Sequence, residues 1–212
     1  MENPVIIFGA NYLGRAAKEI FETNGNVVYG FLDDDKKLHG KELDESVVLG
    51  STDDDGFLKL IGKKCEAFVA LDDNRFRKSV VKTLQEVRHM QPVNAIHKNA
   101  LLSKHVELGH GNFIDLGVKI GVGVTIGSHC VFQLGCTVGV ESVIADFVQI
   151  GSGTIINAGV KIEEEAFIGS GVTIVSGITI GKGARIGAGS VVIGPVKAGE
   201  TVFGNPAQPI KS

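Results

Sequence analysis

Residues 168–192 read IGSGVTIVSGITIGKGARIGAGSVV, and a large aliphatic residue returns at every sixth position of this stretch. The same step runs without an insertion through fourteen large apolar residues: Ile114, Ile120, Ile126, Phe132, Val138, Ile144, Ile150, Ile156, Ile162, Ile168, Ile174, Ile180, Ile186 and Val192. Leu108, Leu102 and Ile96 continue the series toward the N-terminus. A repeat this regular decides the fold of the region that contains it.

Two further positions of the six-residue unit are restricted. Four residues after each aliphatic, the side chain is small or β-branched from Val118 to Val196. Three residues after it, nine of the fourteen units carry glycine, which predicts corners with positive φ. Because one unit makes a short strand and a corner, three units close a triangular coil, and stacked coils add parallel strands about 4.8 Å apart. The pattern predicts a parallel β-helix with an aliphatic interior.

The composition changes sharply along the chain. Residues 109–212 contain 21 of the 29 glycines but 13 of the 45 charged residues. We therefore predict two domains, a Rossmann-like α/β domain over residues 1–92 and a β-helix over residues 93–212. The tail around Gly204 is expected to cover the upper end of the β-helix, where strand edges would otherwise be open.

Charge and hydropathy exclude several classes of function. A net charge of −3 argues against nucleic acid or an anionic membrane as partner. We find no basic leader followed by an apolar segment and no stretch long enough to span a bilayer, so we predict a cytoplasmic protein without membrane insertion. Cys65, Cys130 and Cys136 lack metal-ligand spacing; we expect small buried hydrophobes in a reducing compartment, and no metal.

The N-terminal region alternates between strand and helix patterns. Strands are predicted at 4–8, 27–32 and 67–71, and a helix start is predicted at 51–55. One helix carries Leu13, Ala16, Ala17, Ile20 and Phe21 on one face, and a later one carries Phe76, Val80, Leu84 and Val87. This alternation implies a parallel sheet that binds ligands at the carboxyl ends of its strands.

The loop after the first strand, residues 9–14, is a degenerate dinucleotide fingerprint in which Asn11 replaces the middle glycine. Either a nucleotide phosphate binds at the following helix N-terminus, or the loop is a tight turn without a ligand. The run Asp33–Asp35 either meets a ribose or uracil edge or is a solvated turn.

The order of motifs along almost the whole chain resembles the NeuD/PglD-like sugar acetyltransferases. The motifs are Gly30-Phe31-Leu32-Asp33-Asp34, Asp73-Asn74-Arg75 with Arg77, Ile96-His97, the hexads, and the closing Gly204-Asn205-Pro206-Ala207. The resemblance implies a left-handed β-helix, a homotrimer, and acetyl-CoA as co-substrate between subunits. It also implies that the N-terminal domain holds a UDP- or GDP-linked 4-amino sugar, for which the candidate residues are Gly9, Asn11, Leu13, Asp33 and Asp34.

The catalytic motif of that family, V-E-H-D-C-V-I-G-D, corresponds here to residues 138–146. Val140 stands where the resemblance expects the general-base histidine, and Gly139 replaces the preceding acid. A second family histidine falls on Gln149, and the histidine of the N-terminal loop falls on Leu13. The predicted catalytic positions are therefore Val140 (base lost), Glu141 and Gln149.

The loss of the base favours one acceptor. An amine can lose its proton to water or Glu141 and still attack a bound thioester, whereas a hydroxyl depends more on a base. We therefore predict transfer to an amino group of a nucleotide-linked sugar in surface-glycan biosynthesis, and expect Gly139→Glu with Val140→His to raise it. The resemblance places the coenzyme against Ala158, Ser170 and Ala188. Alternatively, these residues are small only because β-helix corners generally are.

Two other functions compete with the transferase. The first is a catalytically silent relative that binds nucleotide sugar or CoA without turnover. The second is a γ-type carbonic anhydrase, which is disfavoured because no histidine pair has the spacing that a shared zinc needs. His110 and His129 are instead expected at solvent-exposed corners.

Overall fold

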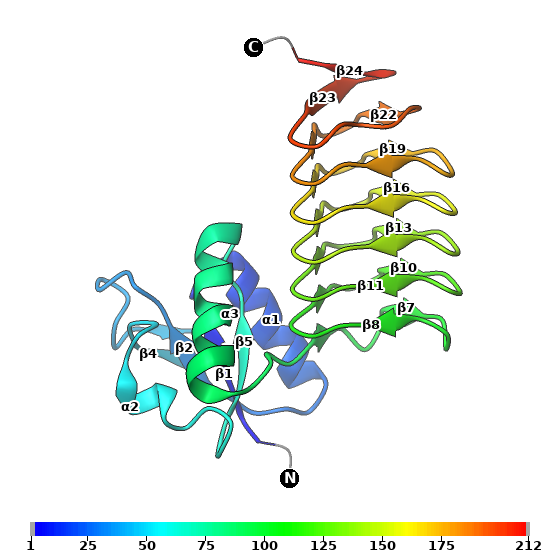
Figure 1. Cartoon of the computed structure of the whole chain (residues 1–212). Coiled ribbons are helices and arrows are strands. Elements are labelled where there is room, and N and C mark those ends of the chain that lie inside the picture. Colours follow the sequence, from blue (N-terminus) through cyan, green and yellow to red (C-terminus); the bar gives the residue numbers. More distant parts are fainter. Residues whose placement is uncertain (1–2, 211–212) are drawn as a thin grey trace. The chain divides into compact units, whose positions relative to one another are not determined.

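The computed structural model describes residues 3–210 and divides into two compact units (Figure 1). The first unit ends at Lys98 and the second begins at Asn99. The boundary predicted from composition, between residues 92 and 93, precedes this division by a few residues. Among the described residues, none of the helices has the length and apolar character needed to cross a membrane.

The first unit is built on a five-stranded sheet with the order β3-β4-β2-β1-β5. Strand β1 pairs in parallel with β2 and β5, β2 pairs in parallel with β4, and β3 is antiparallel to β4. The elements are β1 (Val5–Phe8), α1 (Tyr12–Thr23), β2 (Val28–Leu32), β3 (Glu42–Leu43), β4 (Ser46–Gly50), α2 (Asp55–Leu58), β5 (Glu66–Val69), α3 (Asn74–Arg88) and β6 (Ala95–Ile96).

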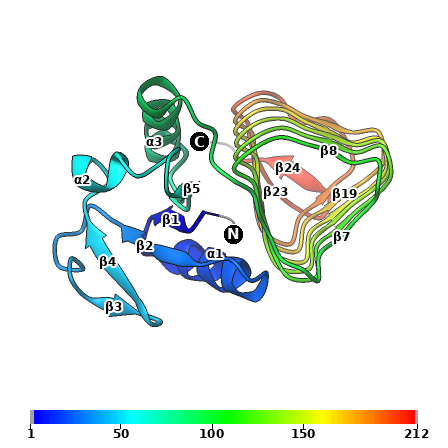
Figure 2. The ribbon, with the colours of Figure 1, turned by 90° about the horizontal axis from the view of Figure 1, so that it is seen from below.

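The sheet is covered on both faces, by α1 on one and α3 on the other (Figure 2). All four residues of β1 are buried, as a central parallel strand requires. The strand order reverses between β1 and β5, because α1 leads from β1 to β2 on one side and β5 returns on the other. Ligands of such sheets bind at this switch point, outside the carboxyl ends of the strands.

The predicted strands and both long helices are confirmed, but the apolar face assigned to α3 is correct only at Leu84. The helix buries Arg77, Val81 and Leu84, whereas Phe76 and Val87 are 63% and 61% exposed. The buried stripe has helical spacing and contains a charged residue, so a hydrophobic pattern could not identify it. The predicted helix start at 51–55 yields only the four-residue α2, capped by Asp54.

The second unit is a left-handed parallel β-helix with three faces (Figures 1 and 2). Face 1 consists of β7 (Leu101–Leu102), β10 (Lys119–Ile120), β13 (Thr137–Val138), β16 (Ile155–Ile156), β19 (Thr173–Ile174) and β22 (Val191–Val192). Face 2 consists of β8 (Glu107–Leu108), β11 (Thr125–Ile126), β14 (Val143–Ile144), β17 (Lys161–Ile162) and β20 (Thr179–Ile180). Face 3 contains β9 (Phe113–Ile114), β12 (Val131–Phe132), β15 (Gln149–Ile150), β18 (Phe167–Ile168), β21 (Arg185–Ile186), β23 (Thr201–Gly204) and β24 (Ala207–Pro209).

The hexad series forms the interior of this prism, as predicted. Each of the fourteen aliphatic positions from Ile114 to Val192 is at most 4% exposed. The companion small positions are buried too, except for the half-buried Ile178. Each strand pairs in parallel with the strand eighteen residues further along the chain, so that Val131 lies opposite Gln149. At the upper end, β23 extends face 3 beside β21 and β24 folds back on it, so the tail continues the sheet.

The corners have left-handed backbone, as the glycine pattern predicts. The nine glycines have φ between 65° and 73°. Four other residues adopt the same conformation, with φ from 54° to 62°: His129, Glu141, Phe147 and Glu165. The prediction that His129 faces solvent is wrong, because its side chain is 3% exposed and its ring lies 4.8 Å from that of Phe147, one coil above.

Candidate functional site

A cavity of about 470 Å³ lies at the carboxyl edge of the first unit's sheet. Its lining comes from the loops after β2, β4 and β5 and from the first turns of α3: Asp33, Asp34, Thr52, Leu71, Asp72, Asp73, Phe76, Ser79 and Val80. The topology predicted a ligand site at this edge. Two of the five predicted substrate-binding residues, Asp33 and Asp34, line the cavity.

The carboxylates around the cavity are held in place by hydrogen bonds. Asp33 accepts from the Ala10 amide through Oδ2 and from the Asp35 amide through Oδ1. Asp34 accepts from the amide and hydroxyl of Thr52, both through Oδ1. Asp73 caps α3, and its hydrogen bonds with the side chain and backbone of Arg75 lower its pKa to about 2. The contacts of Asp33 with Ala10 and of Asp34 with Thr52 join segments that are distant in sequence.

The loop between β1 and α1 is closed by its own side chains. Asn11 Oδ1 accepts from the amides of Leu13 and Gly14, and Asn11 Nδ2 donates to the Ala70 carbonyl. Two of the first free amides of α1, which a phosphate would use, are thus engaged by the cap. Leu13 is 3% exposed, so its side chain belongs to the core.

Steric clashes explain why both ends of this loop, Gly9 and Gly14, are glycine. A Cβ at Gly9, where φ is 107°, would lie 2.7 Å from the Ala70 carbonyl oxygen. A Cβ at Gly14 would strike the Gly9 carbonyl oxygen. Gly9, Asn11 and Leu13 therefore shape the loop beside the cavity without lining it, and their predicted contact with substrate stays a prediction.

Tyr12 is a residue of this region that sequence reasoning missed. Its hydroxyl donates to Asp72 Oδ1 at 2.7 Å, which links the start of α1 to the loop after β5. Partial desolvation, and then the hydrogen bond to Asp72, raise the pKa of Tyr12 to about 12, although the residue as a whole is 63% exposed. The phenol is therefore neutral at physiological pH and serves as a hydrogen-bond donor. No pattern in the sequence pairs these two residues.

The β-helix carries an open groove of about 670 Å³ on face 1. It crosses four coils, from β7 to β16, and its walls are mostly apolar: Ala100, Leu101, Leu102, Ser103, Lys119, Ile120, Gly121, Thr137, Val138, Gly139, Ile155, Ile156, Asn157 and Ala158. Ile155 is 47% exposed in this groove. Ala158 is the only predicted coenzyme residue among those that line it.

Val140, Glu141 and Ala158 gather at the corner between faces 1 and 2. The Val140 carbonyl accepts from the Gly159 amide, so Val140 and Ala158 are stacked on consecutive coils. Val140 is 42% exposed, and Glu141 is exposed with a φ of 54°. One predicted catalytic pair and one predicted coenzyme position are therefore neighbours.

The other predicted residues lie elsewhere on the prism. Gln149 belongs to β15 on face 3, which is opposite the corner that holds Glu141. Ser170 and Ala188 stack at the corner between faces 3 and 1, where the Ser170 carbonyl accepts from the Gly189 amide. A single chain does not bring Glu141 and Gln149 to one site.

Gly139 is required by close packing of consecutive coils. A Cβ at this position would lie 2.6 Å from the Ala158 amide nitrogen. The expectation that Gly139→Glu would help to restore the catalytic motif therefore conflicts with the packing beneath Ala158. Val140 has no such restriction, because it is partly exposed.

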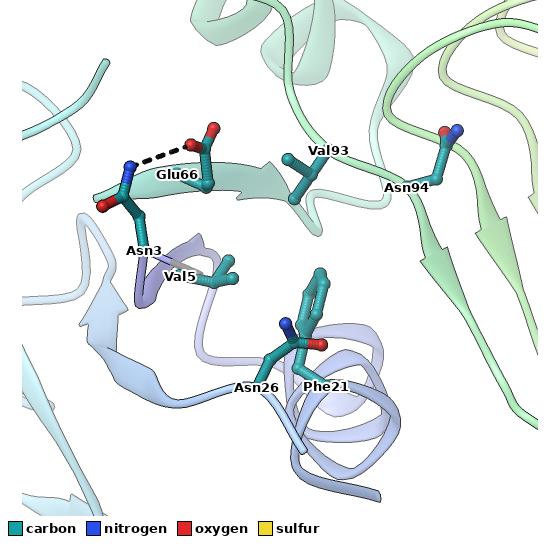
Figure 3. Close-up of a pocket in the computed structure, with 7 residues that line it drawn as sticks. All are labelled: Asn3, Val5, Phe21, Asn26, Glu66, Val93 and Asn94. Carbon is teal, nitrogen blue, oxygen red and sulfur yellow. Dashed lines mark hydrogen bonds between the residues drawn. The ribbon is translucent and has the colours of Figure 1, made fainter. Parts of the chain in front are cut away.

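A further hollow of about 500 Å³ lies at the amino edge of the sheet in the first unit (Figure 3). It is lined by Asn3, Val5, Phe21, Asn26, Glu66, Val93 and Asn94, and Asn3 Nδ2 donates to Glu66 Oε1. Because ligands of parallel sheets bind at the opposite edge, this hollow is not a candidate site.

Within residues 3–210 no three His, Cys, Asp or Glu side chains are grouped so as to hold a metal ion. Cys65, Cys130 and Cys136 are all buried, as expected, and desolvation raises the pKa of Cys136 to about 12.

Each of the two units contains a stretch that matches a known protein family. Residues 4–84 match the PglD N-terminal domain, and residues 159–194 match the bacterial transferase hexapeptide repeats. No curated protein matches the chain significantly.

Solved structures match the chain along its whole length. A histidine-to-asparagine mutant of perosamine N-acetyltransferase from Caulobacter crescentus, in complex with CoA and GDP-perosamine, is 27% identical with a TM-score of 0.92, over 100% of this chain and 99% of that one. The acetyltransferase domain of PglB from Neisseria gonorrhoeae FA1090, with acetyl coenzyme A, is 25% identical with a TM-score of 0.91, over 99% and 100%. WeeI from Acinetobacter baumannii AYE is 27% identical with a TM-score of 0.85, over 98% and 99%.

Both domain types therefore occur here in the order found in these structures, as the sequence motifs predicted. The chain therefore resembles the NeuD/PglD-like hexapeptide-repeat proteins in both of its units.

Proposed function

We propose that the protein transfers an acetyl group from acetyl-CoA to the amino group of a nucleotide-linked 4-amino sugar, in the biosynthesis of a surface glycan. The observation that carries the proposal is the full-length likeness to an N-acetyltransferase with CoA and GDP-perosamine bound. That relative holds both ligands in a form with one histidine replaced. CoA and GDP-perosamine are thus both bound there without that imidazole.

The chemistry suits an amine acceptor. The amine nitrogen attacks the thioester carbonyl, the carbon–sulfur bond breaks, and CoA leaves as the thiolate. The proton released by the nitrogen passes to the thiolate through water or through Glu141, which is exposed at its corner. Positioning supplies a large part of the rate, since holding two reactants together can be worth about 7–11 kcal/mol of barrier. General-base assistance adds about 10²–10⁴-fold, so the absence of histidine at Val140 slows the reaction without abolishing it.

We further propose that the active form is a homotrimer in the cytoplasm. Glu141 and Gln149 lie on opposite sides of one prism, so a site that uses both needs two chains. The same holds for the coenzyme positions, because Ala158 lies at a different corner from Ser170 and Ala188. The groove on face 1 lies between these two corners and offers an apolar surface to the pantetheine arm.

The second candidate is a silent relative that binds nucleotide sugar or CoA without turnover. The aliphatic Val140 at the position of the expected base favours it. A thiol-release assay with acetyl-CoA and a panel of UDP- and GDP-4-amino sugars, run alongside calorimetric binding of each ligand, separates the two. Release of CoA that requires the amino sugar supports the transferase. Binding of both ligands without release refutes it in favour of the silent relative.

A further inference from the structure

The cavity at the carboxyl edge of the sheet has an apolar wall suited to a flat ring. Leu71, Phe76 and Val80 form this wall. The Phe76 side chain is 63% exposed, although it belongs to a helix that buries its neighbour Arg77. An exposed aromatic ring beside aliphatic side chains is a surface on which a nucleobase stacks.

The polar wall accepts hydrogen bonds and hardly donates them. Its groups are the carboxylates of Asp33, Asp34, Asp72 and Asp73 together with the hydroxyls of Thr52 and Ser79, and the lining includes no lysine, arginine or histidine. Ionised carboxylates are acceptors only. A base that enters this cavity must therefore present N–H groups.

The hydrogen bonds already made favour Asp34 over the other three carboxylates, since Asp72 already accepts from the Tyr12 hydroxyl. Asp33 and Asp73 use both carboxylate oxygens within the domain. Asp34 binds Thr52 through Oδ1 alone, so Thr52 fixes the carboxylate while Oδ2 remains as an acceptor on an exposed residue.

The four bases differ in what they offer to one carboxylate. Guanine presents the N1–H and the 2-amino group side by side, so both donors can point at Asp34 Oδ2, whose two lone pairs accept them together. Uracil presents a single N3–H between two carbonyl oxygens. These oxygens are acceptors, so they would face the carboxylate acceptors without forming hydrogen bonds. Adenine and cytosine each place one amino group beside a ring nitrogen that accepts.

We propose that this cavity reads guanine through Asp34, so that the sugar substrate is linked to GDP rather than to UDP. The inference rests on the proposed function, which brings a nucleotide sugar to this domain, and adds the identity of its base. A well-made pair of this kind discriminates between bases by about 10- to 100-fold.

The test is calorimetric titration of the full-length protein with GDP, IDP, UDP and ADP. GDP is expected to bind about 10- to 100-fold more tightly than UDP. IDP, which lacks the 2-amino group, is expected to lose about 10-fold relative to GDP. Asp34→Asn presents an amide that donates, and is expected to remove the preference for GDP. Asp55→Asn, the same change on an exposed residue of α2 outside the cavity lining, serves as the control and is expected to retain it.

The outcomes separate this inference from the proposed function. Equal affinity for UDP, or an unchanged GDP preference in a folded Asp34→Asn variant, overturns the reading of guanine. Acetylation of a UDP-amino sugar but of no GDP-amino sugar also overturns it, while the transferase proposal stands. A strong GDP preference without CoA release from any sugar supports the inference and counts against the transferase.

Discussion

Glu141 occupies a backbone conformation that usually belongs to glycine. Its φ is 54°, and the equivalent corner position is glycine in nine other hexads. Left-handed backbone costs a residue with a Cβ roughly 1–2 kcal/mol, whereas glycine bears a smaller entropic cost of about 0.5–1 kcal/mol. A residue kept at such a corner against this cost is a candidate for a functional role.

Replacement of Glu141 by glycine should separate stability from activity. Glu141→Gly is expected to raise the free energy of unfolding by up to about 1 kcal/mol and to lower CoA release by about 10²-fold, if the carboxylate takes the proton. Glu165→Gly, at another left-handed corner with φ of 62°, is the matched control and should leave transfer unchanged. Urea denaturation and thiol-release rates measure both effects. Full transfer by Glu141→Gly would exclude Glu141 as the base.

Val140→His alone should restore a base at the corner. The residue is 42% exposed, so an imidazole fits there without burial, and transfer is expected to rise by about 10-fold or more. Adding Gly139→Glu should cancel the gain, because its Cβ would lie 2.6 Å from the Ala158 amide. Thiol release by the single and double variants, with thermal melting to follow the fold, compares the two. A double variant that melts normally and outperforms the single one would contradict this packing argument.

At the scale of elements, strand β16 offers a direct test of the prism interior. Ile156 faces inward and is 1% exposed, whereas Ile155 beside it faces the groove and is 47% exposed. Ile156→Ala is expected to cost about 2–5 kcal/mol, and Ile155→Ala less than about 0.5 kcal/mol. Urea midpoints of both variants measure the difference. Equal losses would mean that the outer face is also buried in solution.

Helix α3 should lose stability in acid through its cap. The hydrogen bonds from Arg75 lower the pKa of Asp73 from 3.8 to about 2. Because the folded pKa lies below the unfolded one, the stabilisation is complete above about pH 4 and is lost as the pH falls toward 2. The urea midpoint of the parent should fall over this window by more than that of Asp73→Asn, which keeps the cap but cannot ionise. If the urea midpoints of the two proteins fall in parallel as the pH is lowered, ionisation of Asp73 is not the cause of the acid destabilisation.

The sequence predicts the prism better than the cavity, for a physical reason. Each hexad of the β-helix must bury one large apolar side chain, so the interior appears in the sequence as a six-residue repeat. The cavity depends on single contacts between distant segments, such as Tyr12 with Asp72 and Asp34 with Thr52, which leave no periodic trace. The hairpin β3–β4 escaped prediction because its turn, Asp44-Glu45, reaches positive φ without glycine.

At the scale of the whole molecule, the separation of the predicted residues implies complementation between chains. A Glu141→Ala chain and a Gln149→Ala chain should each transfer far more slowly than the parent, whereas trimers reassembled from an equal mixture should recover about a quarter of parental transfer, since random assortment gives that share of intact sites. Light scattering should report three times the mass of one chain. A monomer in solution, or mixed trimers without activity, would refute the shared site.

The prism also constrains how its length can vary. Partners across every face are eighteen residues apart, so adding or removing a full circuit would leave every column of side chains in line. Loss of a single hexad would instead turn all later coils by a third of a revolution, setting face 2 above face 1. The corners that define the groove would then no longer continue upward, although the aliphatic interior would remain filled. Natural variants of this fold should therefore differ in length by complete coils of eighteen residues, because only such changes keep the outward-facing side chains of each face and corner in register.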